Sequence, residues 1–216
     1  MPIFFQQKVN ETTRLGIWKI EENEEFFRGN VPQHRQVTHP HKRLQHLAGR
    51  FLLQFLFPDF TYELIQIADT RKPFLPDERY HFSISHCGDF AAAIVSRNSR
   101  VGIDIEIPGP KVTRVRDKFL SPSELERLVP PTVNGFDMEQ RLTMLWSAKE
   151  SVFKWYGAGS VDFSEHIQLG LLHADTNSIA CHFAKTGDDL EISYRVFDQL
   201  VLSWVVSGEE ALGVES

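Results

Sequence analysis

Asp104 and Glu106 alternate with valine and isoleucine in the stretch 101–107, Val-Gly-Ile-Asp-Ile-Glu-Ile. This period of two predicts a β-strand with both carboxylates on one face. Residues i and i+2 of a strand lie about 6.6 Å apart, so the carboxylates repel each other unless water or a cation lies between them. Mg²⁺ suits such a pair, because it takes oxygen ligands and is often held by carboxylates together with substrate phosphates. On this stretch alone, a half-buried strand with a solvated acidic face is the favoured interpretation.

A second group of charged residues lies at 146–154, in Trp-Ser-Ala-Lys-Glu-Ser-Val-Phe-Lys. A cap pattern at Asp137 and the glycine at 157 predict a helix over this region, with Lys149 in the middle of its apolar stripe. An ordinary helix pair, worth about 0.2–0.5 kcal/mol, explains Glu150 and Lys154 but not Lys149, which needs a partner or a route to solvent. A site at the edge of the core explains this pattern better.

Positively charged residues suited to phosphate precede the acidic strand. The apolar pattern predicts an amphipathic helix over 41–57, and Arg43, His46 and Arg50 share another of its faces. Arginine presents a planar fork that matches phosphate oxygens, although solvated charge is the commoner reason for such a face. No zinc spacing connects the histidines of this region, which we interpret as a surface cluster: His34, His39, His41 and His46.

A basic loop and a hairpin follow this helix. Lys72 and Pro73 lie in a loop stiffened by prolines. The stretch 80–85 alternates like a strand, and 90–95 is expected to return as the second strand of a hairpin. Ser85 and His86 point to opposite faces of the first strand, so they do not readily form a nucleophile–base pair. We expect His86 to donate to a phosphate; a histidine that stabilises the turn is the alternative.

The second half begins after Pro-Gly-Pro at 108–110. Lys111, Arg114 and Lys118 then share one face of a predicted helix, which is either a docking surface for an acidic partner or solvated charge. A capping box at 121–124 predicts a short helix to about residue 128, and 130–135 is expected to be a loop. The last strands are expected to form an antiparallel meander over 167–172, 179–183, 190–197 and 200–206.

Composition narrows the class of protein. The 216 residues are 42% hydrophobic and 24% charged, which is typical of one large globular domain or two small ones. A net charge of −6 argues against bulk binding to nucleic acid or an anionic membrane. We see no membrane-spanning run and no signal peptide. Cys87 and Cys181 match no metal or redox spacing, so we expect reduced thiols in a cytoplasmic protein.

The motifs at 101–106 and 146–154 together resemble the paired motif of the 4′-phosphopantetheinyl transferases. The strand at 82–86, the Lys-Pro pair at 72–73 and the stretch 118–124 are similar to further family elements in the same order. The resemblance covers about residues 40–165, and the length is that of the larger, monomeric members. It implies an α+β fold of two similar α/β halves, with mainly antiparallel strands and a long helix in each. We place these halves at 1–107 and 108–216, forming one pseudo-symmetric unit.

The resemblance also implies a reaction. Coenzyme A binds between the halves, the serine hydroxyl of an acyl or peptidyl carrier protein attacks its β-phosphorus, and adenosine 3′,5′-bisphosphate leaves. Mg²⁺ is held by Asp104, Glu106 and Glu150. Glu150 is also the expected base, directly or through water, and Lys154 stabilises or protonates the leaving phosphate. The residues expected to bind coenzyme A are Lys72, Pro73, Ser85, His86, Lys149, Lys154 and, for the 3′-phosphate, Arg43 or Arg50.

Two positions depart from the family pattern, in which glycine often precedes the Lys-Pro pair and serine often follows the Ser-His pair. Arg71 and Cys87 occupy these positions. All three acidic positions are filled, which favours an active enzyme. The alternatives are a coenzyme A-binding protein without transferase activity, or an unrelated Mg²⁺-dependent phosphohydrolase or nucleotidyl transferase. The lack of a Gly-rich phosphate loop counts against a nucleoside triphosphatase.

Overall fold

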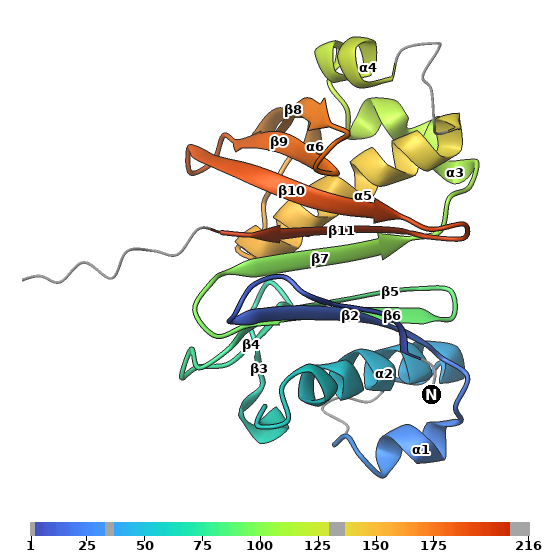
Figure 1. The fold of residues 1–216 in the computed structure, drawn as a ribbon, viewed down its shortest axis with the longest axis vertical. Helices are drawn as coiled ribbons and strands as arrows, with labels where there is room; N and C mark the ends of the chain where they lie inside the picture. Colours follow the sequence, from blue (N-terminus) through green and yellow to red (C-terminus); the bar gives the residue numbers. More distant parts are fainter. Residues whose placement is uncertain (1–2, 33–36, 130–136, 208–216) are drawn as a thin grey trace, which may run out of the picture.

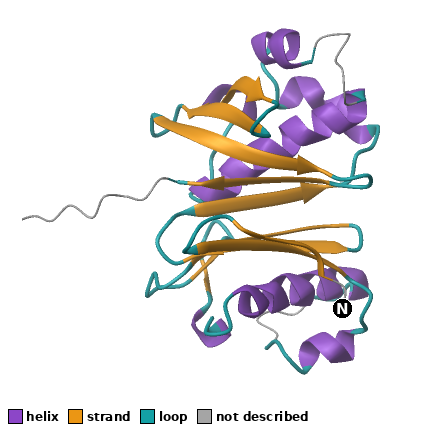
Figure 2. Cartoon of the chain, in the orientation of Figure 1, coloured by secondary structure: helices purple, strands orange, loops and turns teal. Residues whose placement is uncertain are grey.

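Two antiparallel sheets lie between two groups of helices in the computed structural model, which describes residues 3–32, 37–129 and 137–207 (Figure 1). One sheet has the strand order β1-β2-β6-β5 and the other β7-β11-β10-β9-β8. Figure 2 shows that helices cover the outer side of each sheet. This mixture of helices and antiparallel strands confirms the predicted α+β class.

The N-terminal sheet is covered by the predicted amphipathic helix. Its strands are β1 (Ile3–Lys8), β2 (Thr13–Lys19), β5 (His81–Cys87) and β6 (Phe90–Ser96). Its helices are α1 (Glu24–Arg28), α2 (Pro40–Leu56) and the 3₁₀ turn η1 (Tyr62–Leu64), and a small ladder pairs β3 (Gln66–Ile67) with β4 (Pro73–Phe74). The predicted helix at 41–57 and the hairpin are therefore confirmed, whereas β1 was not predicted.

Local sequence signals set the limits of α2. Pro40 occupies its first turn, and the His39 side chain accepts a hydrogen bond from the backbone of Lys42. The helix ends at Leu56, because Phe57 precedes a proline and is held in an extended conformation. Its apolar face packs on β6 and β2 through a core that includes Leu52 and Leu53.

The C-terminal sheet carries the second long helix. Its strands are β7 (Val101–Glu106), β8 (Ile167–His173), β9 (Ser178–Phe183), β10 (Asp188–Val196) and β11 (Val201–Val206). Its helices are α3 (Lys111–Val115), the 3₁₀ turn η2 (Arg116–Lys118), α4 (Pro122–Leu128), α5 (Met138–Tyr156) and α6 (Phe163–His166). The predicted meander, the helix after the capping box and the long helix are confirmed. A capping box of Asp137 and Gln140 opens α5, and Gly157 in the left-handed conformation closes it.

Gly102 allows α5 to pack directly on the acidic strand. A Cβ atom at this position would lie 2.0 Å from the backbone oxygen of Ser151 and 2.7 Å from the backbone nitrogen of Trp155. Any side chain would therefore push the helix away from β7. This close approach brings the motif at 101–106 beside the motif at 146–154, as the candidate site requires.

The sheets meet through an apolar core and two serines. The core comes from β2, β6, β7 and β11 and includes Ile103 and Ile105. At the edges of β5 and β7, Ser83 Oγ accepts from the Ile103 backbone at 3.2 Å and Ser85 Oγ accepts from the Ile105 backbone at 3.3 Å. Serine hydroxyls thus satisfy β7 backbone groups that point away from β11.

Strand pairing bears on the expected division at 107/108. β7 precedes that boundary, yet it pairs with β11, so the acidic strand belongs to the sheet of the C-terminal half. The boundary itself stays a prediction. His34, the expected loop at 130–135 and the chain from 208 lie outside the described residues. Within the described ranges, no helix combines the length and apolar character needed to cross a bilayer.

Candidate active site

Asp104 lies at the centre of a buried polar network between β7, β5 and α5. Its side chain is 3% exposed, and its Oδ1 accepts from Lys154 Nζ at 2.6 Å and from Ser85 Oγ at 2.8 Å. Lys154 Nζ also donates to Ser85 Oγ at 2.8 Å. No hydrogen bond from the described residues reaches the buried Oδ2. One carboxylate oxygen is therefore satisfied by the protein, and the other is left for a further partner.

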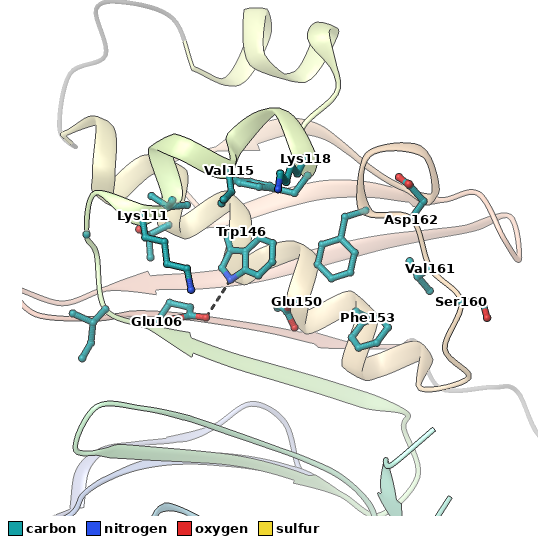
Figure 3. A pocket seen from close by; sticks show the side chains of 16 residues that line it. Glu106, Lys111, Val115, Lys118, Trp146, Glu150, Phe153, Ser160, Val161 and Asp162 are labelled. Atoms are coloured by element: carbon teal, nitrogen blue, oxygen red, sulfur yellow. Dashed lines mark hydrogen bonds between the residues drawn. The ribbon is translucent and has the colours of Figure 1, made fainter. Parts of the chain in front are cut away.

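Glu106 lies on the same face of β7 and is held from two sides. Trp146 Nε1 donates to its Oε1 at 3.1 Å, as Figure 3 shows, and Cys87 Sγ lies 3.4 Å from its Oε2. Burial and the charge of Asp104 raise the pKa of Glu106. Burial, with a smaller effect from Glu106, raises the pKa of Cys87 to about 11, so this thiol is protonated at neutral pH.

Glu150 completes a cluster of three carboxylates. Burial, the charge of Asp104 and a smaller effect from Glu106 together raise the pKa of Glu150 to about 7, against the opposing charge of Lys154. The carboxyl is therefore divided between its two protonation states at neutral pH, which suits a group that accepts a proton from a weak nucleophile. The cluster unites the sequence motifs of β7 and α5.

The cluster has the donor chemistry of a site for a hard dication. Among the described residues, no three acidic, histidine or cysteine side chains converge closely enough to hold a metal ion as they stand. However, Asp104 Oδ2 is buried without a hydrogen bond, and the charge of Asp104 raises the pKa of both glutamates. A dication removes this repulsion and takes oxygen ligands, so the donor types of these residues fit Mg²⁺, whereas their present spacing does not yet form a closed set of ligands.

Lys149 occupies a different environment from the one predicted. Its side chain is 0% exposed, and its Nζ lies 2.8 Å from Glu124 Oε1 and donates to the Phe163 backbone oxygen at 2.8 Å. Glu124 also accepts from the Ser121 and Leu169 backbones, at 2.7 Å and 2.8 Å. The prediction that Lys149 reaches a phosphate is therefore not supported, because its ammonium ties α5 to α4 and α6 inside the core.

A large groove opens beside two of the carboxylates. Its volume is about 910 Å³, and Glu106 and Glu150 line it together with aromatic residues of α5 and α6, among them Trp146 and Phe163 (Figure 3). Lys111 and Lys118 line it too, whereas Arg114 is not among its lining residues in the described part of the chain. The predicted basic face is thus divided, since α3 ends at Val115 and a 3₁₀ turn follows.

A smaller cavity of about 230 Å³ lies next to this groove, and Phe153 lines both spaces. Lys72, Pro73 and Lys154 line this small cavity. Lys72 Nζ donates to the Trp155 backbone oxygen at 3.1 Å, close to the C-terminal end of α5. Burial, with a smaller effect from Arg100, lowers the pKa of Lys72 to about 8.

Arg71 lines the same cavity and adopts a conformation that favours glycine. Its φ is +67°, in the left-handed region that other residues seldom occupy. This explains in physical terms why glycine suits the position before the Lys-Pro pair. The chain keeps arginine there although the backbone conformation costs on the order of 1 kcal/mol.

Arg43, Arg50 and His86, the remaining predicted ligands, are not among the described residues that line the two cavities. Arg43 Nε lies 2.7 Å from Glu24 Oε1 and so holds α1 against α2. Arg50 is 5% exposed and its Nη1 lies 3.0 Å from His46 Nδ1. His86 is exposed on β5, and strand alternation points it away from Ser85.

Three residues of the site were missed or misjudged from the sequence. Trp146 was noted only as part of a motif, yet it orients Glu106. Ser83 was not singled out, and Glu124 was assigned only to a capping box. A lysine inside an apolar stripe did indicate a partner or a route to solvent, but the separation of 25 positions between Glu124 and Lys149 hid the identity of that partner.

Comparison with known proteins agrees with the resemblance drawn from the motifs. A family model described as the 4′-phosphopantetheinyl transferase superfamily matches residues 100–211, which is just over half of the chain. Enterobactin synthase component D of Escherichia coli O157:H7 is 33% identical over 165 residues, covering 71% of this chain and 78% of that protein. The 4′-phosphopantetheinyl transferase AcpT of the same organism is 27% identical over 147 residues, covering 64% of this chain and 73% of that protein.

Proposed function

The chain belongs to the 4′-phosphopantetheinyl transferase superfamily, and we propose that it transfers the 4′-phosphopantetheine group of coenzyme A to a serine of an acyl or peptidyl carrier protein. Adenosine 3′,5′-bisphosphate is the second product. The observation that carries this proposal is the cluster of Asp104, Glu106 and Glu150 beside Lys154, in which the two glutamates line the large groove and the lysine lines the small cavity. We further propose that the enzyme acts as a monomer.

The protein groups supply proton transfer and charge neutralisation. The serine oxygen forms a bond to the β-phosphorus, the bond between that phosphorus and the bridging oxygen breaks, and the electron pair leaves with the 5′-phosphate. Glu150 accepts the serine proton, directly or through water. Lys154 lines the small cavity, and its ammonium stabilises or protonates the leaving phosphate.

Asp104, Glu106 and Glu150 would hold Mg²⁺, whose role when bound is to neutralise the pyrophosphate oxygens as charge develops on them. The protein's own contribution is orientation. Ser85 fixes Asp104 through a 2.8 Å hydrogen bond, and Trp146 fixes Glu106 at 3.1 Å. We assign the phosphates and adenosine of coenzyme A to the small cavity with Lys72 and Pro73, and the carrier serine to the large groove.

Product analysis separates this proposal from its alternatives. Coenzyme A and Mg²⁺ are incubated with the protein, with and without an apo carrier protein, and coenzyme A and adenosine 3′,5′-bisphosphate are quantified by chromatography. A transferase produces the bisphosphate only when the carrier is present. Consumption of coenzyme A without the carrier would indicate a phosphohydrolase. Coenzyme A binding without turnover, tested with both acyl and peptidyl carriers, would indicate a binding protein.

The pKa of Lys72 predicts how coenzyme A binding depends on pH. The side chain is charged below its pKa of about 8, and two of its three donors remain after the bond to the Trp155 oxygen. A phosphate binds the charged form, so affinity should fall as the pH rises through about 8, by up to roughly tenfold per unit. Calorimetry of coenzyme A binding at several pH values measures this fall.

A matched variant isolates the contribution of Lys72. The Lys72→Gln protein should bind coenzyme A more weakly at pH 7, and its affinity should not show the decline above pH 8. The same decline in both proteins would mean that another group titrates and that Lys72 does not contact the phosphates.

The basic residues beside the large groove predict a docking surface for an acidic carrier. Replacing Lys111, Arg114 and Lys118 with glutamate should raise the KM for the carrier by roughly tenfold and leave kcat unchanged. Charges at the rim of an interface act mainly on the rate at which the two proteins associate. The affinity for coenzyme A should change little. Steady-state kinetics at varied carrier concentration and salt measures the effect.

The control reverses three exposed cations of the N-terminal half, which are Lys8, Lys19 and Arg28. An unchanged carrier KM in the first variant, or an equal rise in the control, would show that Lys111, Arg114 and Lys118 are ordinary solvated charges and do not dock the carrier.

A further inference from the structure

Lys154 neutralises the most buried carboxylate of the candidate active site. Its Nζ lies 2.6 Å from Asp104 Oδ1, and the two side chains are 26% and 3% exposed. A buried carboxylate without a cation is costly, and Glu106 and Glu150 add further negative charge around Asp104. The ammonium is therefore the group that makes this arrangement of three carboxylates stable.

Ser85 joins the lysine to the carboxylate. Its Oγ accepts from Lys154 Nζ and donates to Asp104 Oδ1, both at 2.8 Å, and it accepts from the Ile105 backbone at 3.3 Å. The hydroxyl is thus fixed to β7. It and the Lys154 ammonium both bind Oδ1 of Asp104. Asp104 Oδ2 receives no hydrogen bond from the described residues.

The ammonium of Lys154 can leave Asp104 for a second position, in the small cavity. The side chain is one-quarter exposed and lines the small cavity that also contains Lys72. Lys149, on the same helix, differs from Lys154 because its side chain is 0% exposed. Its ammonium is held inside the core by partners on α4 and α6. An anion in the small cavity would offer Lys154 an alternative to Asp104.

We propose that Lys154 is an exchangeable counterion of Asp104, which a dication must displace before it can bind that carboxylate. The inference rests on the proposed function, in which Asp104 is a metal ligand and the small cavity holds phosphates. An ammonium and a dication on one carboxylate repel each other, so the lysine keeps the intrinsic affinity for the dication low. A phosphate that draws Lys154 away raises this affinity, and the coupling is reciprocal.

Binding of Mn²⁺ alone tests the proposal without any turnover. Free Mn²⁺ is measured by electron paramagnetic resonance during titration of the wild-type protein and the Lys154→Met variant at pH 8, with neither coenzyme A nor carrier present. The variant should bind Mn²⁺ roughly tenfold more tightly than the wild type. Adding adenosine 3′,5′-bisphosphate should tighten Mn²⁺ binding more in the wild type than in the variant, because only the wild type also gains from the release of Lys154.

Three further variants sharpen the result. Lys154→Gln serves as a second neutral variant if the methionine protein does not fold. Lys154→Arg keeps the charge and should bind Mn²⁺ like the wild type. Lys118→Met is the matched control, since it removes a cation that lines the large groove and not the small cavity. Equal or weaker Mn²⁺ binding by the folded neutral variants, including no detectable binding by any protein, overturns the proposal. Carrier modification by the wild type would still support the proposed function in that case, so the two failures are distinguishable.

Discussion

The Asp104→Ala variant should lose carrier modification by roughly a thousandfold or more. The change removes the carboxylate proposed to hold the metal, and metal stabilisation of developing charge contributes several kcal/mol to such reactions. It also removes the partner of Lys154, whose ammonium lies 2.6 Å from Asp104 Oδ1. Because Lys154 is partly exposed, it can turn to solvent and the fold should survive. The rate of holo-carrier formation at saturating substrates measures the loss.

Two further variants test whether the loss comes from the missing carboxylate of Asp104. Asp104→Asn keeps the shape of the side chain and should be nearly as inactive, since an amide is a poor ligand for a hard dication. Asp189→Ala removes an exposed aspartate of β10 that pairs with His182 and should retain the wild-type rate. Activity close to wild type in Asp104→Ala, with the circular dichroism spectrum unchanged, would contradict the metal-site assignment.

The Lys149→Met variant should lose about 3–5 kcal/mol of unfolding free energy, because it leaves the Glu124 carboxylate buried without its cation. The Lys149 and Glu124 side chains are 0% and 3% exposed, and their charged atoms lie 2.8 Å apart. Urea denaturation followed by tryptophan fluorescence measures the loss.

A double variant distinguishes a structural role of Lys149 from phosphate binding. Glu124→Gln removes the stranded charge and keeps one of the two oxygens that accept from the Ser121 and Leu169 backbones. Lys149→Met combined with Glu124→Gln should therefore recover part of the stability and, if Lys149 is structural, the wild-type KM for coenzyme A. A folded double variant with a strongly raised KM would restore the original prediction that Lys149 contacts a phosphate.

The fold was largely predictable where the sequence carries strong local signals. Capping boxes, apolar stripes and period-2 alternation identified α2, α4, α5 and the strands of the C-terminal meander. β1 was missed, although its residues pair with β2 along almost its full length. The pairing of β7 with β11 could not be foreseen, because it joins strands separated by about 100 residues and no local pattern specifies such a contact.

The site was predictable in its carboxylates and less so in its cations. Asp104, Glu106 and Glu150 were recognised from two motifs, and Gly102 shows why the motifs meet, since it lets α5 lie against β7. Cations depend on partners that sequence spacing does not reveal. Arg43 is tied to Glu24 and Lys149 to Glu124, whereas Lys154 and Lys72 line the small cavity to which we assign the phosphates.

Intact-protein mass spectrometry of an apo carrier protein tests the central claim most directly. The carrier is incubated with this protein, coenzyme A and Mg²⁺, and a parallel sample contains EDTA. We predict that the carrier gains the mass of one phosphopantetheine group at its serine, and that EDTA prevents the gain. An unchanged mass for acyl and peptidyl carriers alike, under conditions in which an authentic transferase modifies the same samples, would contradict the proposed function.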